Sequence, residues 1–90
     1  MFRLDGRTAL ITGGGGGLGA AIADLFTQAG ARVVVAGRRR FAGELPSVTF
    51  DITNDRQVAS GIAQARGLLG GRIDILVNSA GILTEATVVE

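Results

Sequence analysis

The stretch "LITGGGGGLGA", residues 10–20, places five consecutive glycines between two segments of different periodicity. The residues that enter it, "TALIT" at 8–12, are short, apolar and β-prone, which predicts a strand. After the glycines, apolar residues recur at the spacing of one helix face, and Gly30 is the expected stop: Leu18, Ile22, Leu25, Phe26 and Ala29. A strand fused to a glycine turn and a helix is not the context of a flexible linker.

The rest of the chain continues to alternate between strand and helix patterns. "RVVVAG" at 32–37 is apolar enough for a strand covered on both faces, and 48–52 and 73–78 are two more strand candidates. Residues 53–69 predict a helix with Thr53 as its N-cap and Gly70 and Gly71 closing it. Its apolar face is Val58, Ile62, Ala65 and Leu69.

This order predicts an α/β fold, a Rossmann-type parallel sheet of about four strands in the order 3-2-1-4, with helices on both faces. The crossing at 38–47 is short for a parallel connection and contains Gly43 and Pro46, so we expect one helical turn or an irregular path there. With four strands, the outer edge of the fourth would be unpaired.

Composition excludes several classes of function. The chain has 90 residues, a net charge of +1 and no Cys, His, Trp or Tyr, and all nine of its basic residues are Arg. Thiolate and imidazole metal sites are therefore excluded, so no metal is expected. No apolar run is long enough to span a membrane, and "MFRLDGR" at the N-terminus has no signal-peptide pattern, which makes a cytoplasmic location the expectation.

The glycine turn has the properties of a phosphate-binding loop. Unpaired N–H groups and the dipole at a helix start attract anions, and glycine lets a pyrophosphate approach without a Cβ in the way. A nucleoside-triphosphate P-loop would need a Lys, which the chain lacks. Gly14, Gly16 and Gly19 satisfy the dinucleotide pattern G-x-G-x-x-G literally, but a run of five glycines also satisfies other registers.

Four features in order resemble the short-chain dehydrogenase/reductase family over nearly the whole chain. Thr12-Gly13-x-x-x-Gly17-Leu18-Gly19 resembles its T-G-x-x-x-G-x-G loop. The others are the opening "LDGRTALITGG", the "DIT" at Asp51–Thr53 after the third strand, and Asn78-Ser79-Ala80-Gly81, a version of the family's N-N-A-G motif. Residues 1–90 would then be the N-terminal portion of an NAD(P)-binding Rossmann domain, shortened relative to the full family fold.

The resemblance implies a role for each matching residue. Gly13, Gly17 and Gly19 would shape the pyrophosphate loop, with Leu18 offering a backbone contact. Gly16 lies where many relatives carry Ser or a basic residue that grips the ribose or its phosphate. Asp51 and the backbone of Ile52 would hold the adenine edge, although Asp51 capping the next helix stays an alternative. The last group would line the cofactor near its ribose and nicotinamide: Asn78, Ala80 and Gly81.

The end of the second strand indicates which nicotinamide cofactor is preferred. NAD enzymes place an acid there to bind the ribose 2′-OH, whereas Gly37 occupies that position here and Arg38 follows. A guanidinium can pair with a 2′-phosphate in a forked geometry, so NADP(H) is expected over NAD(H), with Arg38 first and Arg39 in support. For Arg39 and Arg40 a solvated loop stays an alternative, and three arginines without aromatic residues do not predict nucleic-acid binding.

The family's catalytic Tyr and Lys have no counterpart in this chain, so no catalytic residue is assigned and the chain alone is expected to be inactive. The resemblance implies an oxidoreductase that transfers hydride between nicotinamide and a carbonyl or alcohol, this chain supplying the cofactor-binding half. Its substrate would bind only in a complete protein, with homo-oligomers possible. The alternatives are a non-catalytic NADP(H)-binding module and an inactive truncated fragment. We expect a fragment, a truncated reading frame or one piece of a larger assembly.

Overall fold

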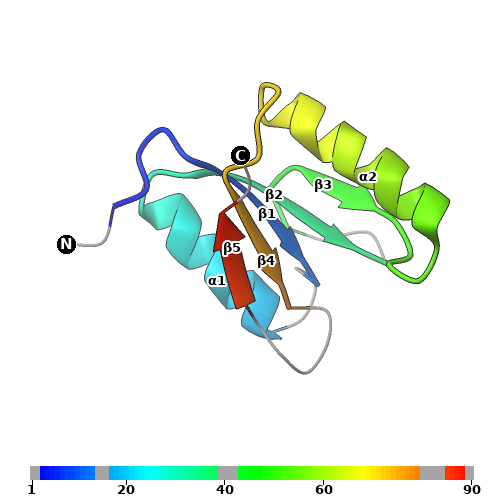
Figure 1. Cartoon of the computed structure of the whole chain (residues 1–90). Coiled ribbons are helices and arrows are strands. Elements are labelled where there is room, and N and C mark those ends of the chain that lie inside the picture. Colours follow the sequence, from blue (N-terminus) through cyan, green and yellow to red (C-terminus); the bar gives the residue numbers. More distant parts are fainter. Residues whose placement is uncertain (1–2, 14–16, 39–42, 80–84, 89–90) are drawn as a thin grey trace.

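The computed structural model describes residues 3–13, 17–38, 43–79 and 85–88. Along the chain it contains β1 (Thr8–Thr12), α1 (Gly17–Gln28), β2 (Arg32–Gly37), β3 (Ser47–Thr49), α2 (Asp55–Leu68), β4 (Ile75–Asn78) and β5 (Glu85–Val88). The strands form one sheet in the order β3-β2-β1-β4-β5, with one helix against each face (Figure 1). β1 pairs parallel with β2 and β4, and β2 pairs parallel with β3, which confirms the predicted 3-2-1-4 arrangement.

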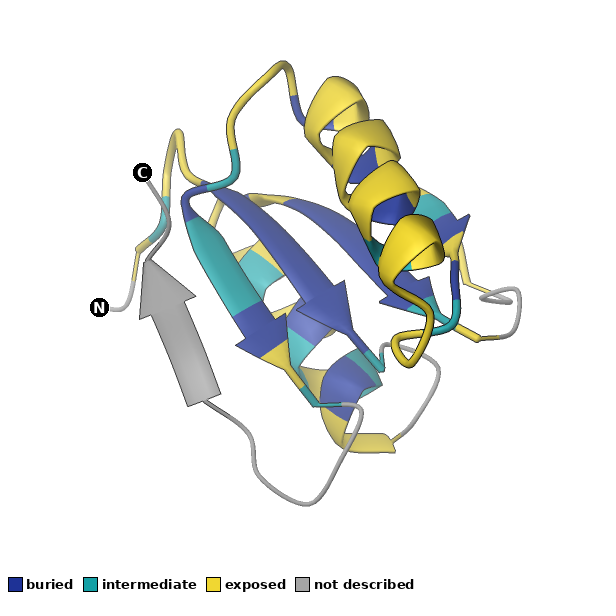
Figure 2. Ribbon diagram, turned by 45° about the vertical axis from the view of Figure 1, so that its right-hand side comes forward, coloured by how far each residue is buried: buried dark blue, intermediate teal, exposed yellow. Residues whose placement is uncertain are grey.

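Alternate residues of the central strands supply two separate cores. Ala9 and Ile11 of β1 pack with Val33 and Val35 of β2 on the α1 side. Leu10 belongs to the core on the α2 side, together with Val34, Ala36 and Val48. Because both faces of β1 and β2 are covered, both strands are apolar at successive positions, and the burial in Figure 2 is concentrated in these strands.

The buried face of α1 differs from the predicted one. Gly19 and Ala23 are the buried residues of the helix, and Ile22 and Phe26 pack against the core beside them. Leu18 and Leu25, which belong to the predicted apolar face of the helix, are 58% and 54% exposed. The helix therefore approaches the sheet along its small residues, because Gly and Ala allow its backbone to lie close to β1.

Helix α2 begins one residue later than expected. Asn54 is its N-cap and accepts a hydrogen bond from the backbone N–H of Gln57 at 3.1 Å, so the assignment of Thr53 as N-cap was wrong. Instead, the hydroxyl and the backbone N–H of Thr53 both donate hydrogen bonds to the Asp51 carboxylate. At the other end, Gly70 and Gly71 have φ of +83° and +102°, a conformation that favours glycine and ends the helix as predicted.

Two strands are shorter than their sequence patterns. β3 ends at Thr49, not at residue 52, because its pairing with β2 ends at Gly37. The Phe50 ring then turns toward Gly61 of α2. β4 starts at Ile75, not at residue 73, because the side chain of Asp74 binds Thr8 ahead of the paired residues. Of the crossing at 38–47, residues 38 and 43–45 are bends and none of the described residues is helical.

The expectation of an unpaired β4 edge was wrong. β5 runs antiparallel to β4 and pairs with all four of its residues, from Ile75↔Val88 to Asn78↔Glu85. It is the one antiparallel strand among the described elements and carries the sheet's outer edge (Figure 1). Within the described part of the chain, no helix is long and apolar enough to cross a membrane.

Candidate functional site

The carboxyl ends of β1, β2 and β4 meet beside the first turn of α1. This is the edge at which open parallel sheets bind ligands, and it contains most of the described candidate residues. Gly13 follows β1 with φ of +73°, and its N–H donates to the carbonyl oxygen of Ala36 at 2.7 Å. The turn after β1 is thereby tied to the end of β2, and its conformation favours glycine.

Helix α1 approaches this turn so closely at position 19 that only glycine fits there. A Cβ at Gly19 would lie under 3.0 Å from the carbonyl of Gly13 and 2.7 Å from the Ser79 hydroxyl oxygen. Among the described residues, nothing lies within 4 Å of a Cβ position at Gly17, the first residue of the helix. Gly19 therefore serves packing within the protein, whereas no described residue fills the space beside Gly17.

Thr12 joins the ends of β1 and β4. Its Oγ1 lies 2.9 Å from Oδ1 of Asn78 and 3.3 Å from the Val77 carbonyl oxygen. Its own carbonyl oxygen accepts two hydrogen bonds from Ser79, from the backbone N–H at 3.1 Å and from the hydroxyl at 2.5 Å. Asn78 is thus held at the same junction as Gly13 and Gly19.

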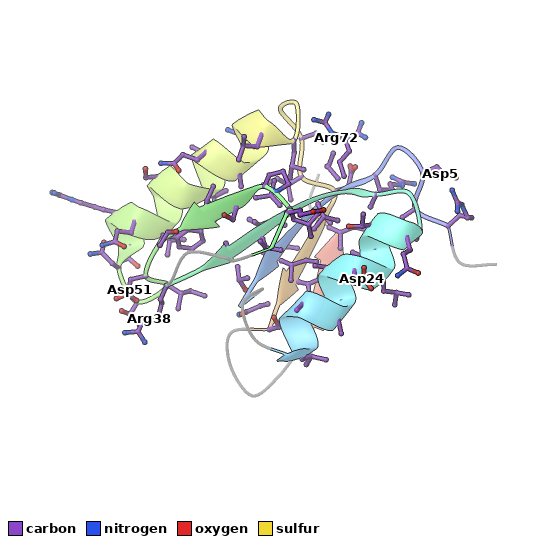
Figure 3. The ribbon with its side chains drawn as sticks, turned by 180° about the vertical axis from the view of Figure 1, so that it is seen from behind. Asp5, Asp24, Arg38, Asp51 and Arg72 are labelled. Atoms are coloured by element: carbon purple, nitrogen blue, oxygen red, sulfur yellow. The ribbon has the colours of Figure 1, made fainter. Side chains whose placement is uncertain are left out.

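A second group of candidates lies at the ends of β2 and β3. Arg38 is exposed directly after β2, and Asp51 is half-buried after β3. Figure 3 shows both labelled residues at one end of the molecule, with Arg72 and Asp5 at the other. Ile52, beside Asp51, is 42% exposed.

The Asp51 carboxylate is held in its charged form. Its Oδ1 accepts hydrogen bonds from the N–H of Thr53 at 2.9 Å and from its hydroxyl at 2.7 Å. These two bonds, with the positive charge of Arg38 as a smaller cause, lower the pKa of Asp51 below its ordinary value. Asp51 organises the turn before α2, but the residue that caps α2 is Asn54.

Gly16, Arg39, Ala80 and Gly81 lie outside the described residues. Leu18 begins α1 beside the glycine turn, with its side chain exposed. The sequence analysis assigned no role to Ser79, although it lies inside the Asn78–Gly81 motif. A hydroxyl side chain at that position of the motif could have identified it as a candidate. Among the residues that the structure describes, no group of three or more Asp, Glu, His or Cys is placed to hold a metal ion.

Residues 7–90 match the family model described as short chain dehydrogenase. An uncharacterized oxidoreductase of Mycobacterium tuberculosis is 44% identical over 93 residues, covering 90% of this chain and 35% of the relative. The Pseudomonas aeruginosa RhlG/NADP active-site complex is similar with a TM-score of 0.76 and 39% identity, over 90% of this chain and 37% of that one.

A 3-ketoacyl-(acyl-carrier-protein) reductase from Brucella melitensis, complexed with NADH, has a TM-score of 0.72 and 34% identity, over 80% of this chain and 33% of that one. The chain spans between 28% and 43% of the length of the curated relatives it matches, or about a third. The similarity therefore concerns one part of these proteins.

Proposed function

The chain belongs to the short-chain dehydrogenase/reductase family, and we propose that it supplies the cofactor-binding half of an NADP(H)-dependent oxidoreductase. In this proposal residues 1–90 are the N-terminal portion of the NAD(P)-binding domain. The cofactor, when bound, supplies or accepts the hydride exchanged with a carbonyl or alcohol. This chain's own contribution is to hold and orient the dinucleotide.

The observation that carries the proposal is the pair of features at neighbouring strand ends. The glycine turn after β1 leads into a 12-residue helix, whose first N–H groups and dipole favour an anion such as a pyrophosphate. Arg38 stands exposed at the end of β2, where an NAD-preferring protein would carry an acid. Its guanidinium is suited to the 2′-phosphate that distinguishes NADP(H) from NAD(H).

The close packing at Gly19 supports the same assignment. A Cβ there would collide with the Gly13 carbonyl, so glycine at position 19 lets the helix start lie close to Gly13. No described residue lies beside the Cβ position of Gly17, and in this proposal a phosphate group takes that space at the helix start. Gly16, Arg39, Ala80 and Gly81 are further proposed contacts, with Leu18 and Ile52 contributing backbone.

The preference for NADP(H) rests on Arg38 and not on the relatives. One similar structure is described as an NADP complex and another as an NADH complex. Asp51 would lie toward the adenine, and Asn78 toward the ribose and nicotinamide. The sequence contains no Tyr and no Lys, so we propose that the chain alone has no reductase activity and that its substrate binds only in a complete protein.

Titration with NADPH and with NADH tests the proposal directly. The chain has no Trp or Tyr, so the fluorescence of the reduced nicotinamide is measured without overlapping protein emission. We expect saturable binding, tighter for NADPH than for NADH, and no carbonyl reduction. Absence of binding by a chain whose circular dichroism and cooperative unfolding show it to be folded would contradict cofactor binding. Carbonyl reduction at enzymatic rates would contradict inactivity.

A further inference from the structure

Ser79 lies where three elements meet, and none of the roles assigned above uses its side chain. It follows β4 directly, and its hydroxyl oxygen is 2.5 Å from the carbonyl oxygen of Thr12 at the end of β1. The same oxygen lies 2.7 Å from the position that a Cβ of Gly19 would occupy in α1. The Ser79 side chain therefore fills the space between the ends of two strands and the first turn of the helix.

The Thr12 carbonyl is already bonded without this hydroxyl. The backbone N–H of Ser79 donates to it at 3.1 Å, continuing the pairing of β1 with β4. The hydroxyl is a second donor to the same oxygen, and it approaches from the side chain. The Ser79 hydroxyl is therefore not needed for β1 and β4 to pair, and we expect it to fix the orientation of the Thr12–Gly13 peptide.

That peptide begins the glycine turn. Gly13, with φ of +73°, binds Ala36 of β2 through its N–H, and its carbonyl limits how closely α1 can approach at Gly19. A rotation of the Thr12–Gly13 peptide would move the turn relative to the first turn of α1. Anion binding by N–H groups depends on their common direction, so such a movement would weaken it.

We propose that Ser79 is a positioning residue, whose hydroxyl fixes the glycine turn against α1 and so sets the affinity for the pyrophosphate of the dinucleotide. This inference rests on the proposed NADP(H) binding and adds a residue to it. Ser79 acts through Thr12 and Gly13, whereas Arg38 and Asp51 follow β2 and β3.

The test compares two ligands on the full 90-residue chain. NADPH carries the pyrophosphate and the 2′-phosphate, whereas adenosine 2′-monophosphate carries the 2′-phosphate and has no 5′-phosphate to bind at the glycine turn. With Ser79→Ala we expect NADPH binding to weaken about 2- to 10-fold, the effect of losing one hydrogen bond. Binding of adenosine 2′-monophosphate should change less than 2-fold, a difference that general loosening of the fold would not produce.

Ser60→Ala is the matched control, because Ser60 is exposed on α2, away from the glycine turn. Ser79→Cys is the second variant: it keeps the shape of the side chain with a larger atom and a much weaker donor, so it reports on the hydrogen bond if the alanine variant does not fold. We expect it to reproduce the selective loss.

Each outcome decides one of the two proposals. If the wild-type chain binds neither ligand, NADP(H) binding is wrong and the role of Ser79 falls with it. If the wild-type chain binds both and the folded Ser79 variants bind NADPH as tightly, or lose both ligands equally, the positioning role alone is wrong. A selective loss of NADPH supports it.

Discussion

The carboxylate of Asp74 accepts a hydrogen bond from the backbone N–H of Thr8 at 2.9 Å. The Asp74 side chain thus binds the first residue of β1, where β1 and β4 begin to pair. The Thr8 hydroxyl lies 3.2 Å from the same oxygen, and Arg72 Nε is 2.8 Å from the other one. Arg72 also donates to the Gly6 carbonyl at 3.0 Å. These contacts hold the amino ends of both strands, at the opposite end of the sheet from the glycine turn.

Asp74→Asn should make the chain less stable at neutral pH and reduce its sensitivity to acid. The Thr8 N–H is the main cause of a lowered pKa of Asp74, opposed by burial and aided by the Thr8 hydroxyl and Arg72. A lowered pKa in the folded state means that the charged form stabilises the fold above the unfolded pKa of about 3.9, and that this contribution is lost as the pH falls through the folded value.

Urea unfolding between pH 7 and pH 3 measures this effect. The difference in unfolding free energy between wild type and Asp74→Asn should shrink as the pH falls. Asp24→Asn is the control, because Asp24 is exposed on α1 and its carboxylate accepts from Gln28 on the same helix. A difference that stays constant over the whole pH range would contradict the role of the Asp74 charge.

Gly61→Ala should destabilise the chain by about 1–3 kcal/mol, because the added methyl overpacks the core. A Cβ at Gly61 would lie under 3.0 Å from the Phe50 ring. Gly67→Ala is the matched control on the same helix: nothing lies within 4 Å of its Cβ position, so it should stabilise by about 0.5–1 kcal/mol through helix propensity. Thermal and urea unfolding decide between them, and equal effects of the two substitutions would show that Phe50 does not limit position 61.

Gly19→Ala and Gly17→Ala should separate packing from ligand binding. The first places a methyl against the Gly13 carbonyl and should cost about 1–3 kcal/mol of stability. The second meets no atom of the described residues and should leave unfolding unchanged while weakening NADPH binding, because its methyl enters the proposed phosphate space. Unfolding and NADPH titration of both variants test this, and a Gly17→Ala chain that binds normally would exclude Gly17 from the site.

Arg38→Asp should weaken NADPH binding about 10- to 100-fold, since charge-assisted hydrogen bonds to a phosphate are lost, and change NADH binding much less. Arg66→Asp makes the same change of charge in the last turn of α2 and controls for net charge. Fluorescence titration with both nucleotides measures the ratio. An equal loss for NADPH and NADH would contradict recognition of the 2′-phosphate by Arg38.

Asn54→Ala should cost about 1 kcal/mol, the usual value of an N-cap, and Thr53→Ala should cost less. The Asn54 side chain accepts from the Gln57 N–H, whereas Asp51 still accepts the Thr53 N–H when the hydroxyl is removed. Urea unfolding compares the two variants. A larger loss of unfolding free energy for Thr53→Ala than for Asn54→Ala would show that Thr53 is the N-cap.

The sequence predicted the elements whose pattern is strong and local. "RVVVAG" matches β2 residue for residue, and Gly30, Gly70 and Gly71 end the helices with positive φ. The exposed Leu18 and Leu25 were misplaced because periodicity finds the apolar arc of a helix but not the line along which it meets the sheet. Small residues form that line here: Gly19 and Ala23 are buried, and Gly19 lies too close to Gly13 for a Cβ.

By itself the sequence predicted the parallel 3-2-1-4 strand order, because strand and helix patterns alternate along the chain, and the structure confirms that order. The tertiary structure decided the contacts of Ser79 with Thr12 and of Asp74 with Thr8, across 67 and 66 residues. It also decided that β5 pairs with β4. No local pattern encodes the contacts of Ser79 and Asp74, because they exist only once parallel pairing brings β1 and β4 side by side.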